Sequence, residues 1–421
     1  MNNAAPISPA GKWKSDSMQK RVRARYAAER RFRLFGLAAV GLSVAFLAFL
    51  LVTMVANGAS GFFRTEAPVT IDFDEAGVML DAQSLEGRNA RNAIAGANLD
   101  RVVREAAVAQ YGEEGANVFG QAATIELTQR LLDDPTILSE GGTFTLPVAS
   151  DLDLAVKGDG RAEAEALQQI VERNAGFERS FSWTFLTASD STDPSAVGIW
   201  GALKGSFFTI IVTMALAFPI GVLSAVYLEE FASRNRWTDM VEVSINNLAA
   251  VPSIIFGLLG LAVFLNVMDM PRSAPIVGGL TLALMTMPVI VIAGRNAIKA
   301  VPPSIRDAAL GVGASKMQVV FHHVLPLALP GILTGTIIGM ARALGETAPL
   351  LLIGMRAFIA SPPDGFTDKA TVLPMQIFLW SDEVDRGFVE KTSAAIIVLL
   401  LFMLAMNALA IYLRNKFERR W

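Results

Sequence analysis

The sequence predicts an all-α polytopic membrane protein with six transmembrane helices and a small α+β domain inserted outside the membrane. Of the 421 residues, 52% are hydrophobic and 18% are charged, whereas average soluble chains contain about 25% charged residues. The apolar residues are concentrated in six runs, and the segments between these runs differ in the sign of their charge. Together these observations indicate a membrane protein with one substantial soluble part.

The first apolar run, at residues 34–56, contains 23 residues without a charge, and about 20 are needed to cross a bilayer. No small-residue cleavage site precedes it, so we expect an uncleaved membrane helix rather than a signal peptide. Five further runs of similar length follow, at 205–228, 245–267, 274–293, 332–354 and 392–413. Six helices would place both termini on the same side of the membrane.

The distribution of charge predicts which side that is. Residues 1–33 carry nine Lys and Arg residues against two acidic ones, and the tail 414–421 carries four basic residues. Residues 57–195 instead contain 23 acidic and 10 basic residues. Because cytoplasmic loops of membrane proteins are enriched in Lys and Arg, we expect both termini in the cytoplasm. Basic termini can also bind nucleic acid, but beside a membrane helix the topological explanation is preferred, and we expect no nucleic-acid partner.

These observations predict a division of the chain into five parts. They are a basic cytoplasmic N-terminus at 1–33, a first transmembrane helix at 34–56, an acidic extracytoplasmic domain at 57–196, a membrane core at 197–413 with five helices and a cytoplasmic loop at 296–330, and a cytoplasmic tail at 414–421.

Within the acidic domain, secondary structure can be predicted but function cannot. Val69, Ile71 and Phe73 alternate in a pattern typical of a strand. Residues 161–175 place an apolar stripe on one face of a helix, and residues 90–112 also look helical. The chain has no cysteine and its two histidines, His322 and His323, are adjacent, so neither disulfides nor a multi-ligand metal site is expected. No cofactor is predicted.

The loop at 296–330 has an organisation of its own. Pro302, Pro303 and Ser304 form a good helix start, and the helical pattern breaks at Gly311 and Gly313 before a second helix that runs to Leu325-Pro326. Two short helices joined at a glycine would form a compact knob that could dock into a groove of a cytoplasmic partner. An ordinary pair of amphipathic helices on the inner membrane surface would give the same pattern.

The spacing in this loop resembles the EAA loop of ABC importer permeases. The matching residues are Asp307, Ala308, Ala309, Gly313, Leu325 and Pro326. Asp307 replaces the usual glutamate, and His323 stands where an aliphatic residue is commoner. The stretches "AAVPSIIFGLLG", "TMPVIVIAGRNAIKAVPPSIRDAALGVGAS" and "ALGETAPLLLIG" are similar to PstA-type phosphate permease subunits of ABC importers, in a variant with a long N-terminal part. The resemblance covers about residues 181–421 and does not explain the insert.

The resemblance implies an assembly and a set of site residues. A permease of this type forms half of a heterodimeric pore for inorganic phosphate with a second permease subunit, is driven by a dimer of ATP-binding subunits, and receives phosphate from an extracytoplasmic binding protein. It implies that Arg306 and the motif residues of the loop contact the ATPase, and that Arg342 and Arg295 act in transport. The chain contains no GxxxxGK[ST] motif, so we expect no ATPase activity of its own and expect the bacterial inner membrane as its location.

Arg342 and Glu346 are the only charged residues between residues 331 and 354. Charges within a membrane span are costly and commonly line a substrate route. Arginine binds phosphate through a planar, permanently charged fork, and the glutamate could accept the hydroxyl proton of phosphate while repelling sulfate, which has none. A structural ion pair between residues four apart is the competing explanation.

Three other functions would fit parts of the sequence. A permease for another oxyanion would share the same motifs. A proton-coupled secondary transporter could use Arg342 and Glu346 without an ATPase, although inverted repeats are not visible in the sequence. A sensor would need a cytoplasmic output domain, for which this chain offers only a loop and two tails. Pro252 and Pro349 lie within predicted spans and are expected to bend them.

Overall fold

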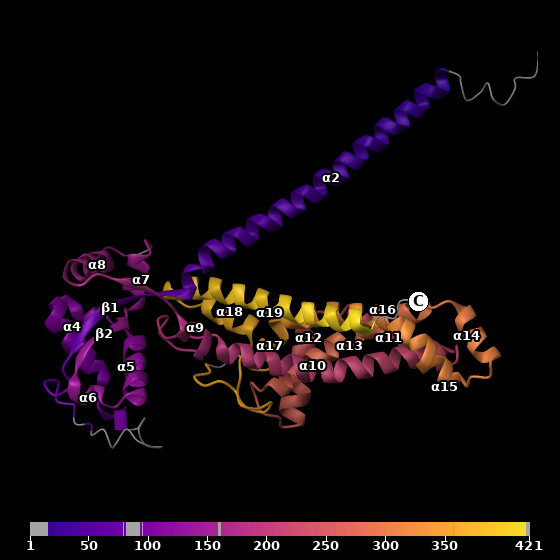
Figure 1. Cartoon of the computed structure of the whole chain (residues 1–421). Helices are drawn as coiled ribbons and strands as arrows, with labels where there is room; N and C mark the ends of the chain where they lie inside the picture. Colours follow the sequence, from indigo (N-terminus) through magenta and orange to yellow (C-terminus); the bar gives the residue numbers. More distant parts are fainter. Residues whose placement is uncertain are drawn as a thin grey trace, which may run out of the picture. The chain divides into compact units, whose positions relative to one another are not determined.

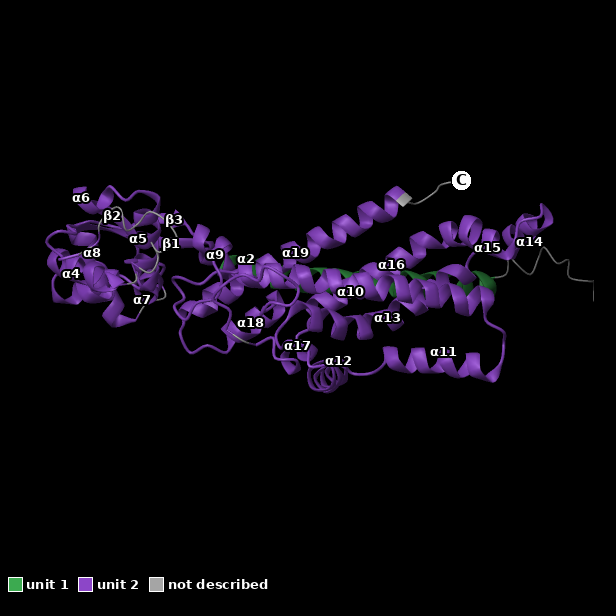
Figure 2. Cartoon of the chain, turned by 90° about the horizontal axis from the view of Figure 1, so that it is seen from below, with its two compact units in different colours: residues 1–56 green, residues 57–421 purple. Residues whose placement is uncertain are grey.

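The structure is a computed structural model and describes residues 16–417 except 79, 81–92, 95, 159–160 and 357. The predicted basic residues Lys12, Lys14, Arg419 and Arg420 and part of the helix predicted at 90–112 lie outside the described residues. The chain divides into two compact units, residues 1–56 and residues 57–421 (Figure 2).

The described part of the first unit is one long helix. α2 (Asp16–Gly58) has 43 residues and contains the whole predicted run 34–56, so the helix begins well before its apolar part. Its large apolar side chains, from Leu34 to Val55, are exposed along the helix. Such a surface requires lipid rather than water as its solvent, which agrees with the predicted first span.

The long helices of the second unit confirm a membrane fold. In the described part of the chain as a whole, five helices are long and apolar enough to cross a membrane, or six if one bent pair is counted as a single span. Besides α2 they are α10 (Trp200–Val226), α13 (Pro275–Lys299), α16 (Leu325–Gly345) and α19 (Gly387–Phe417). In Figure 1, α10, α13, α16 and α19 form an elongated bundle.

The predicted span 245–267 is not one straight helix. α11 (Arg236–Ala249) and the segment formed by α12 (Ser253–Gly260) and the π-helix η5 (Leu261–Val267) meet at an angle of 100°. Pro252 lies at the break as the N-cap of α12, with an extended ψ of 136°. The prediction that Pro252 bends this span is therefore confirmed, but the bend is a complete break.

The predicted span 332–354 is also interrupted. α16 ends at Gly345, Glu346 has an extended backbone, and a short helix α17 (Ala348–Leu352) follows with Pro349 in its first turn. Proline is well suited to the first turn of a helix, where its missing N–H is not needed. Pro349 therefore starts a new helix rather than kinking the one before it.

Small residues bring the long helices of this unit close together. A Cβ added at Gly279 of α13 would lie 2.4 Å from the Cβ of Val212 of α10, and one added at Gly335 of α16 would lie 2.0 Å from the Cβ of Ala293 of α13. Such positions accept only glycine, and close backbone approach of this kind is typical of helix packing in membranes. The membrane core is completed by α18 (Leu373–Ser381), which packs on α19.

The insert at 57–196 folds around a small antiparallel sheet of strand order β2-β1-β3. Val69 and Ile71 are buried in β1, as predicted, and Phe73 is buried just after the strand ends. The stripe predicted at 161–175 is buried in the helix α8. The elements are η1 (Ser60–Phe62), β1 (Phe63–Ile71), α4 (Leu99–Tyr111), η3 (Glu113–Asn117), α5 (Gln121–Asp133), α6 (Ile137–Glu140), β2 (Gly142–Pro147), α7 (Ser150–Val156), α8 (Ala162–Asn174), β3 (Glu178–Phe181) and α9 (Trp183–Thr187).

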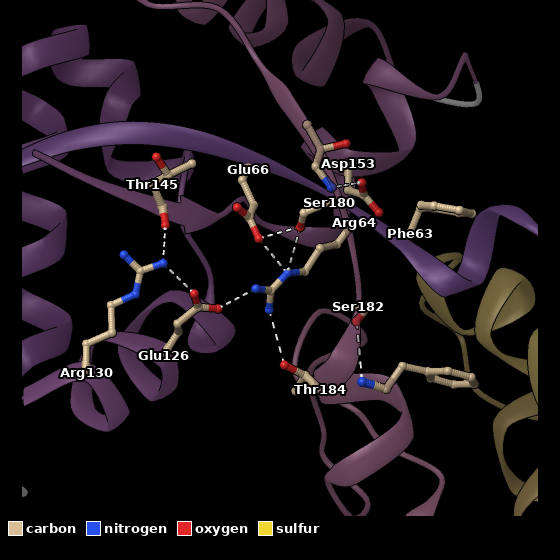
Figure 3. A network of polar contacts seen from close by, with 12 residues as sticks. Phe63, Arg64, Glu66, Glu126, Arg130, Thr145, Asp153, Ser180, Ser182 and Thr184 are labelled. Carbon is tan, nitrogen blue, oxygen red and sulfur yellow. Dashed lines mark hydrogen bonds and ion pairs between the residues drawn. The ribbon is translucent and has the colours of Figure 1, made fainter. Parts of the chain in front are cut away.

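A network of ion pairs centred on Arg64 joins the sheet to the helices around it (Figure 3). Arg64 in β1 pairs with Glu66 at 2.7 Å and with Glu126 of α5 at 2.6 Å, and its Nη1 donates to Thr184 of α9 at 3.2 Å. Arg130 of α5 pairs with the other oxygen of Glu126 at 2.7 Å. The side chains of Arg64, Glu66 and Glu126 are only 10–20% exposed, so the network fixes β1, α5 and α9 relative to one another.

The insert is also attached to the beginning of α19. Lys157, which follows α7, pairs with Glu390 at 3.0 Å. Lys391 is buried and donates to the carbonyl oxygen of Gly61 at 3.1 Å. A Cβ at Gly61 would lie 2.8 Å from the Cβ of Ala394, so the backbone of η1 lies directly against α19. The insert is therefore held on the membrane core by buried polar contacts rather than by its chain connections alone.

Candidate functional site

Arg342 and Glu346 form an ion pair at the end of α16. Arg342 Nε lies 3.3 Å from Glu346 Oε1, and the two side chains are 43% and 19% exposed. The neighbouring residues Ala343 and Leu344 are buried in the largest apolar cluster of the membrane core. α16 therefore buries one face in the chain's own core, while Arg342 is exposed on another face and Glu346, just after the helix, is mostly buried.

Glu346 is held differently from Arg342. It is the first residue after α16, with φ −78° and ψ 122°, so its side chain is presented by extended backbone rather than by the helix. The following peptide leads into α17, whose Leu350 is buried. The break in the helix gives Glu346 a direction that a continuous helix would not allow, while the ion pair with Arg342 is still made.

Arg295 lies in a different environment. Its Nε donates to Glu229 at 2.5 Å and its Nη2 pairs with Glu242 of α11 at 2.6 Å, and its side chain is 9% exposed. Lys299 also reaches Glu229, at 3.3 Å. Two carboxylates thus neutralise Arg295, and no ion pair joins it to Glu346 in the described residues. The two arginines that the resemblance assigns to transport are not brought together in one site.

Two short helices joined at a glycine lie between α13 and α16, whereas the predicted loop 296–330 also includes the end of α13 and the start of α16. α14 (Pro303–Gly311) is followed by Gly313 with a φ of +90°, which is a conformation that favours glycine. Ser315 then starts α15 (Lys316–Gln318) with a capping box made with Gln318. The chain continues through the π-helix η6 (Val319–Val324) directly into α16. The second helix therefore does not stop at Leu325-Pro326 as predicted, because Pro326 occupies the first turn of α16.

The motif residues of the loop divide between its surface and its interior. Ala309 is buried, in an apolar cluster with residues of α10, α13, η6 and α16. Asp307 and Ala308 are exposed on α14, while Leu325 and Pro326 are half-buried. The knob also presents large apolar side chains to solvent at its tip, namely Leu310, Val312 and Met317, which are 51%, 86% and 57% exposed. The loop and the insert lie at opposite ends of the helix bundle (Figure 1).

Arg306 ties the loop to two helices. Its Nε and Nη2 donate to the same oxygen of Glu230, at 3.1 and 2.7 Å, and its side chain is 22% exposed. Glu229, Glu230 and Glu242 were not predicted as site residues. The sequence signal was present, since Glu229 and Glu230 follow directly on an apolar run, but their partners lie far along the chain and no local pattern indicates them.

No group of three or more His, Cys, Asp or Glu residues suited to a metal ion is found in the residues that the structure describes.

Two family descriptions match the chain. Residues 199–421 match "Binding-protein-dependent transport system inner membrane component", and residues 19–166 match a domain of unknown function, DUF3333. The second match runs from within α2 to within α8, so it combines the first helix with most of the insert.

Individual relatives match about half of the chain. Over 47% of its length the chain is 34% identical to "Probable ABC transporter permease protein YqgI" of Bacillus subtilis, of which the match covers 67%. Over 58% of its length the chain is 32% identical to "Phosphate transport system permease protein PstA 1" of Mycobacterium tuberculosis, of which the match covers 78%. Over 50% of its length it is 30% identical to the PstA protein of Haemophilus influenzae, of which the match covers 73%. A structure of the MetNI methionine ABC transporter superposes with a TM-score of 0.42 at 19% identity, over 53% of this chain and 95% of that one.

Proposed function

Because the chain belongs to the family of binding-protein-dependent transport system inner membrane components, we propose that it is a permease subunit of an ATP-driven importer for inorganic phosphate. It would form half of the translocation pathway. The observation that carries the proposal is the ion pair between the exposed Arg342 of α16 and Glu346 just after that helix, in a chain with relatives named phosphate transport permeases.

The chemistry of the pair suits phosphate. The guanidinium group of Arg342 stays charged and offers parallel donors to two phosphate oxygens. Phosphate near neutral pH still carries a hydroxyl group, which the carboxylate of Glu346 accepts, whereas sulfate leaves the carboxylate unpaired and repelled. The 3.3 Å ion pair is the resting arrangement in this proposal, and phosphate competes with Glu346 for the guanidinium group.

The proposal includes three protein partners. The exposed apolar tip at Leu310, Val312 and Met317 fits a groove on one of two ATP-binding subunits, because large exposed apolar groups commonly mark protein interfaces. A second permease subunit would cover the open face of α16. An extracytoplasmic phosphate-binding protein would deliver the substrate. The chain itself is a transport subunit and not an ATPase.

The proposed orientation follows from the charges and the fold together. We place residues 57–196 outside the bacterial inner membrane and residues 1–33, 296–330 and 414–421 in the cytoplasm, with 34–56 and the helices of 197–413 in the bilayer. The excess of acidic residues in 57–195 and of basic residues in 1–33 supports this assignment. The position of the insert and the loop at opposite ends of the bundle (Figure 1) is consistent with it.

The test is uptake of radiolabelled phosphate and sulfate in vesicles that contain the complete importer. Arg342→Gln should lower phosphate uptake at least about tenfold, since lost charge-assisted hydrogen bonds to a bound anion cost ~1.5–3 kcal/mol. Arg342→Lys should restore little, because a point charge lacks the bidentate geometry. Glu346→Gln should lower discrimination against sulfate.

A purely structural ion pair predicts the opposite pattern. Each single substitution would then leave one uncompensated charge and reduce the amount of assembled complex, and the double substitution Arg342→Met/Glu346→Leu would recover both assembly and uptake. Recovery of phosphate uptake in that double variant would refute the assignment of Arg342 and Glu346 to the pathway.

A further inference from the structure

Two consecutive glutamates fasten the loop 296–330 to the end of α10. Glu229 and Glu230 lie in the π-helix η4 (Tyr227–Phe231), which continues α10 by one wide turn. We propose that these glutamates are positioning residues of the transport cycle, which pass movement of the loop on to α10 and α13. The inference rests on the proposed function, since only an ATP-driven permease needs such a connection.

Glu230 holds the loop through Arg306. Besides its two hydrogen bonds to Glu230, Arg306 donates from Nη1 to the carbonyl oxygen of Val301 at 2.7 Å and from Nη2 to that of Ile298 at 3.0 Å. Ile298 lies in the last turn of α13 and Val301 two residues after the helix ends at Lys299, where the negative end of the helix dipole attracts a cation. One guanidinium group therefore joins α14, the end of α13 and the end of α10.

Glu229 makes the second connection, to the helices themselves. It accepts from Arg295 of α13 and pairs with Lys299, and Arg295 in turn pairs with Glu242 of α11. The six residues, which we call the glutamate joint, contain three cations and three carboxylates. They are Glu229, Glu230, Glu242, Arg295, Lys299 and Arg306.

The position of the two glutamates explains how neighbours can serve different partners. Successive residues of a helix point in different directions, and the ion pairs show that Glu229 faces Arg295 of α13 while Glu230 faces Arg306 of α14. π-helical turns occur frequently at functional sites. The side chains of Glu229 and Glu230 are only 12% and 10% exposed, so water competes little for these bonds.

The loop contacts α10 and α13 through apolar side chains, and the ion pairs give this contact a defined geometry. Beneath the joint, Val226 of α10, Ile298 of α13 and Ala309 of α14 share an apolar cluster. Apolar contacts are non-directional and would allow the knob to slide over the helices. Hydrogen bonds to a charged group depend on geometry, so a pull on α14 is carried to α10 and α13 rather than absorbed at the contact.

The experiment measures ATP hydrolysed per phosphate imported, in vesicles with the complete importer. Glu230→Gln keeps the shape of the side chain and removes the charge, and it should raise this ratio at least about threefold while the ATP-binding subunits still co-purify. The matched control is Asp239→Asn on α11, an exposed carboxylate with no ion pair in the described part of the chain, and it should leave the ratio unchanged. A wild-type ratio in Glu230→Gln would overturn the inference.

Two further variants distinguish a role in passing on movement of the loop from a role in stabilising the assembled complex. If Glu230 and Arg306 act as one connection, Arg306→Gln should raise the ratio, and the double variant should be no worse than the worse single one. Additive effects would overturn the inference. If the Glu230→Gln complex does not assemble, Glu230→Asp can be tested instead, because it retains the charge on a shorter side chain. It should give an intermediate ratio of ATP hydrolysed to phosphate imported, and a wild-type ratio would overturn the inference. A wild-type complex without ATP-dependent phosphate import would instead refute the proposed function.

Discussion

Replacement of Arg64 by methionine should loosen the sheet of the insert. Methionine replaces the aliphatic part of the arginine side chain but leaves Glu66 and Glu126 without their shared cation (Figure 3). Removing one partner from a buried ion pair costs about 3–5 kcal/mol. Here the carboxylates are 10% and 20% exposed, and Glu126 keeps its pair with Arg130. We therefore expect a smaller loss of local stability, about 2 kcal/mol.

Hydrogen exchange of backbone amides is the appropriate measurement, because it reports local opening separately from unfolding of the membrane helices. Arg64 in β1 pairs with Ser180 in β3, so peptides that cover residues 178–184 should report the change. At about 1.4 kcal/mol per factor of ten, a loss of about 2 kcal/mol accelerates exchange roughly 30-fold.

The matched control is Arg101→Met in α4. Arg101 also pairs with a glutamate, Glu105, but at 3.4 Å and with side chains that are 51% and 54% exposed. Exposed helix pairs of this kind contribute about 0.3–0.5 kcal/mol, so exchange should change by less than about threefold. If Arg64→Met accelerates exchange no more than Arg101→Met does, the network does not hold the sheet.

Three further outcomes are expected. In intact cells, an impermeant thiol reagent should label Ser139→Cys in the insert but not Ser315→Cys in the loop, both exposed positions in a chain without cysteine; the reverse pattern would contradict the proposed orientation. Gly313→Val forces a β-branched residue to a φ of +90°, and uptake should fall while the chain still inserts; wild-type uptake would show that this turn is not required. Burial raises the pKa of the Asp190 carboxyl group above its ordinary value of 3.8, although a hydrogen bond from Trp380 opposes the shift. Protonated Asp190 therefore stabilises the folded state at pH values below 3.8, and this stabilisation is lost as pH rises through the raised pKa. The melting temperature of Asp190→Asn relative to wild type should therefore increase from pH 4 to pH 7, and a constant difference would contradict this.

The positions of the long helices could be predicted because membrane helices require about 20 consecutive apolar residues. Their ends could not, since α2 starts at Asp16 and α19 continues to Phe417, through charged residues that hydropathy excludes. Hydropathy also does not detect breaks in the backbone of a helix. It counted 245–267 and 332–354 as single spans, although Pro252 and Pro349 each begin a new helix there.

The candidate site was predictable only where its partners are local. Arg342 and Glu346 stand out as charges in an apolar run and are four residues apart, so the helix period alone suggests their ion pair. Arg295 also stands out, but its partner Glu229 is 66 residues away in sequence. That contact depends on how α10 packs against α13, which in turn depends on close approaches such as that of Gly279, and no sequence period contains this information.

α10 links the two polar assemblies of the second unit. The Arg64 network holds Thr184 in α9, shortly before α10 begins at Trp200, and the glutamate joint holds the turn that continues α10 beyond Val226. A helix of 27 residues spans about 40 Å at 1.5 Å per residue. Pro219 lies within it and removes one helical hydrogen bond, so a bend in α10 is expected there. The part of α10 after Pro219 would then move with the loop, and the part before it would stay with the insert.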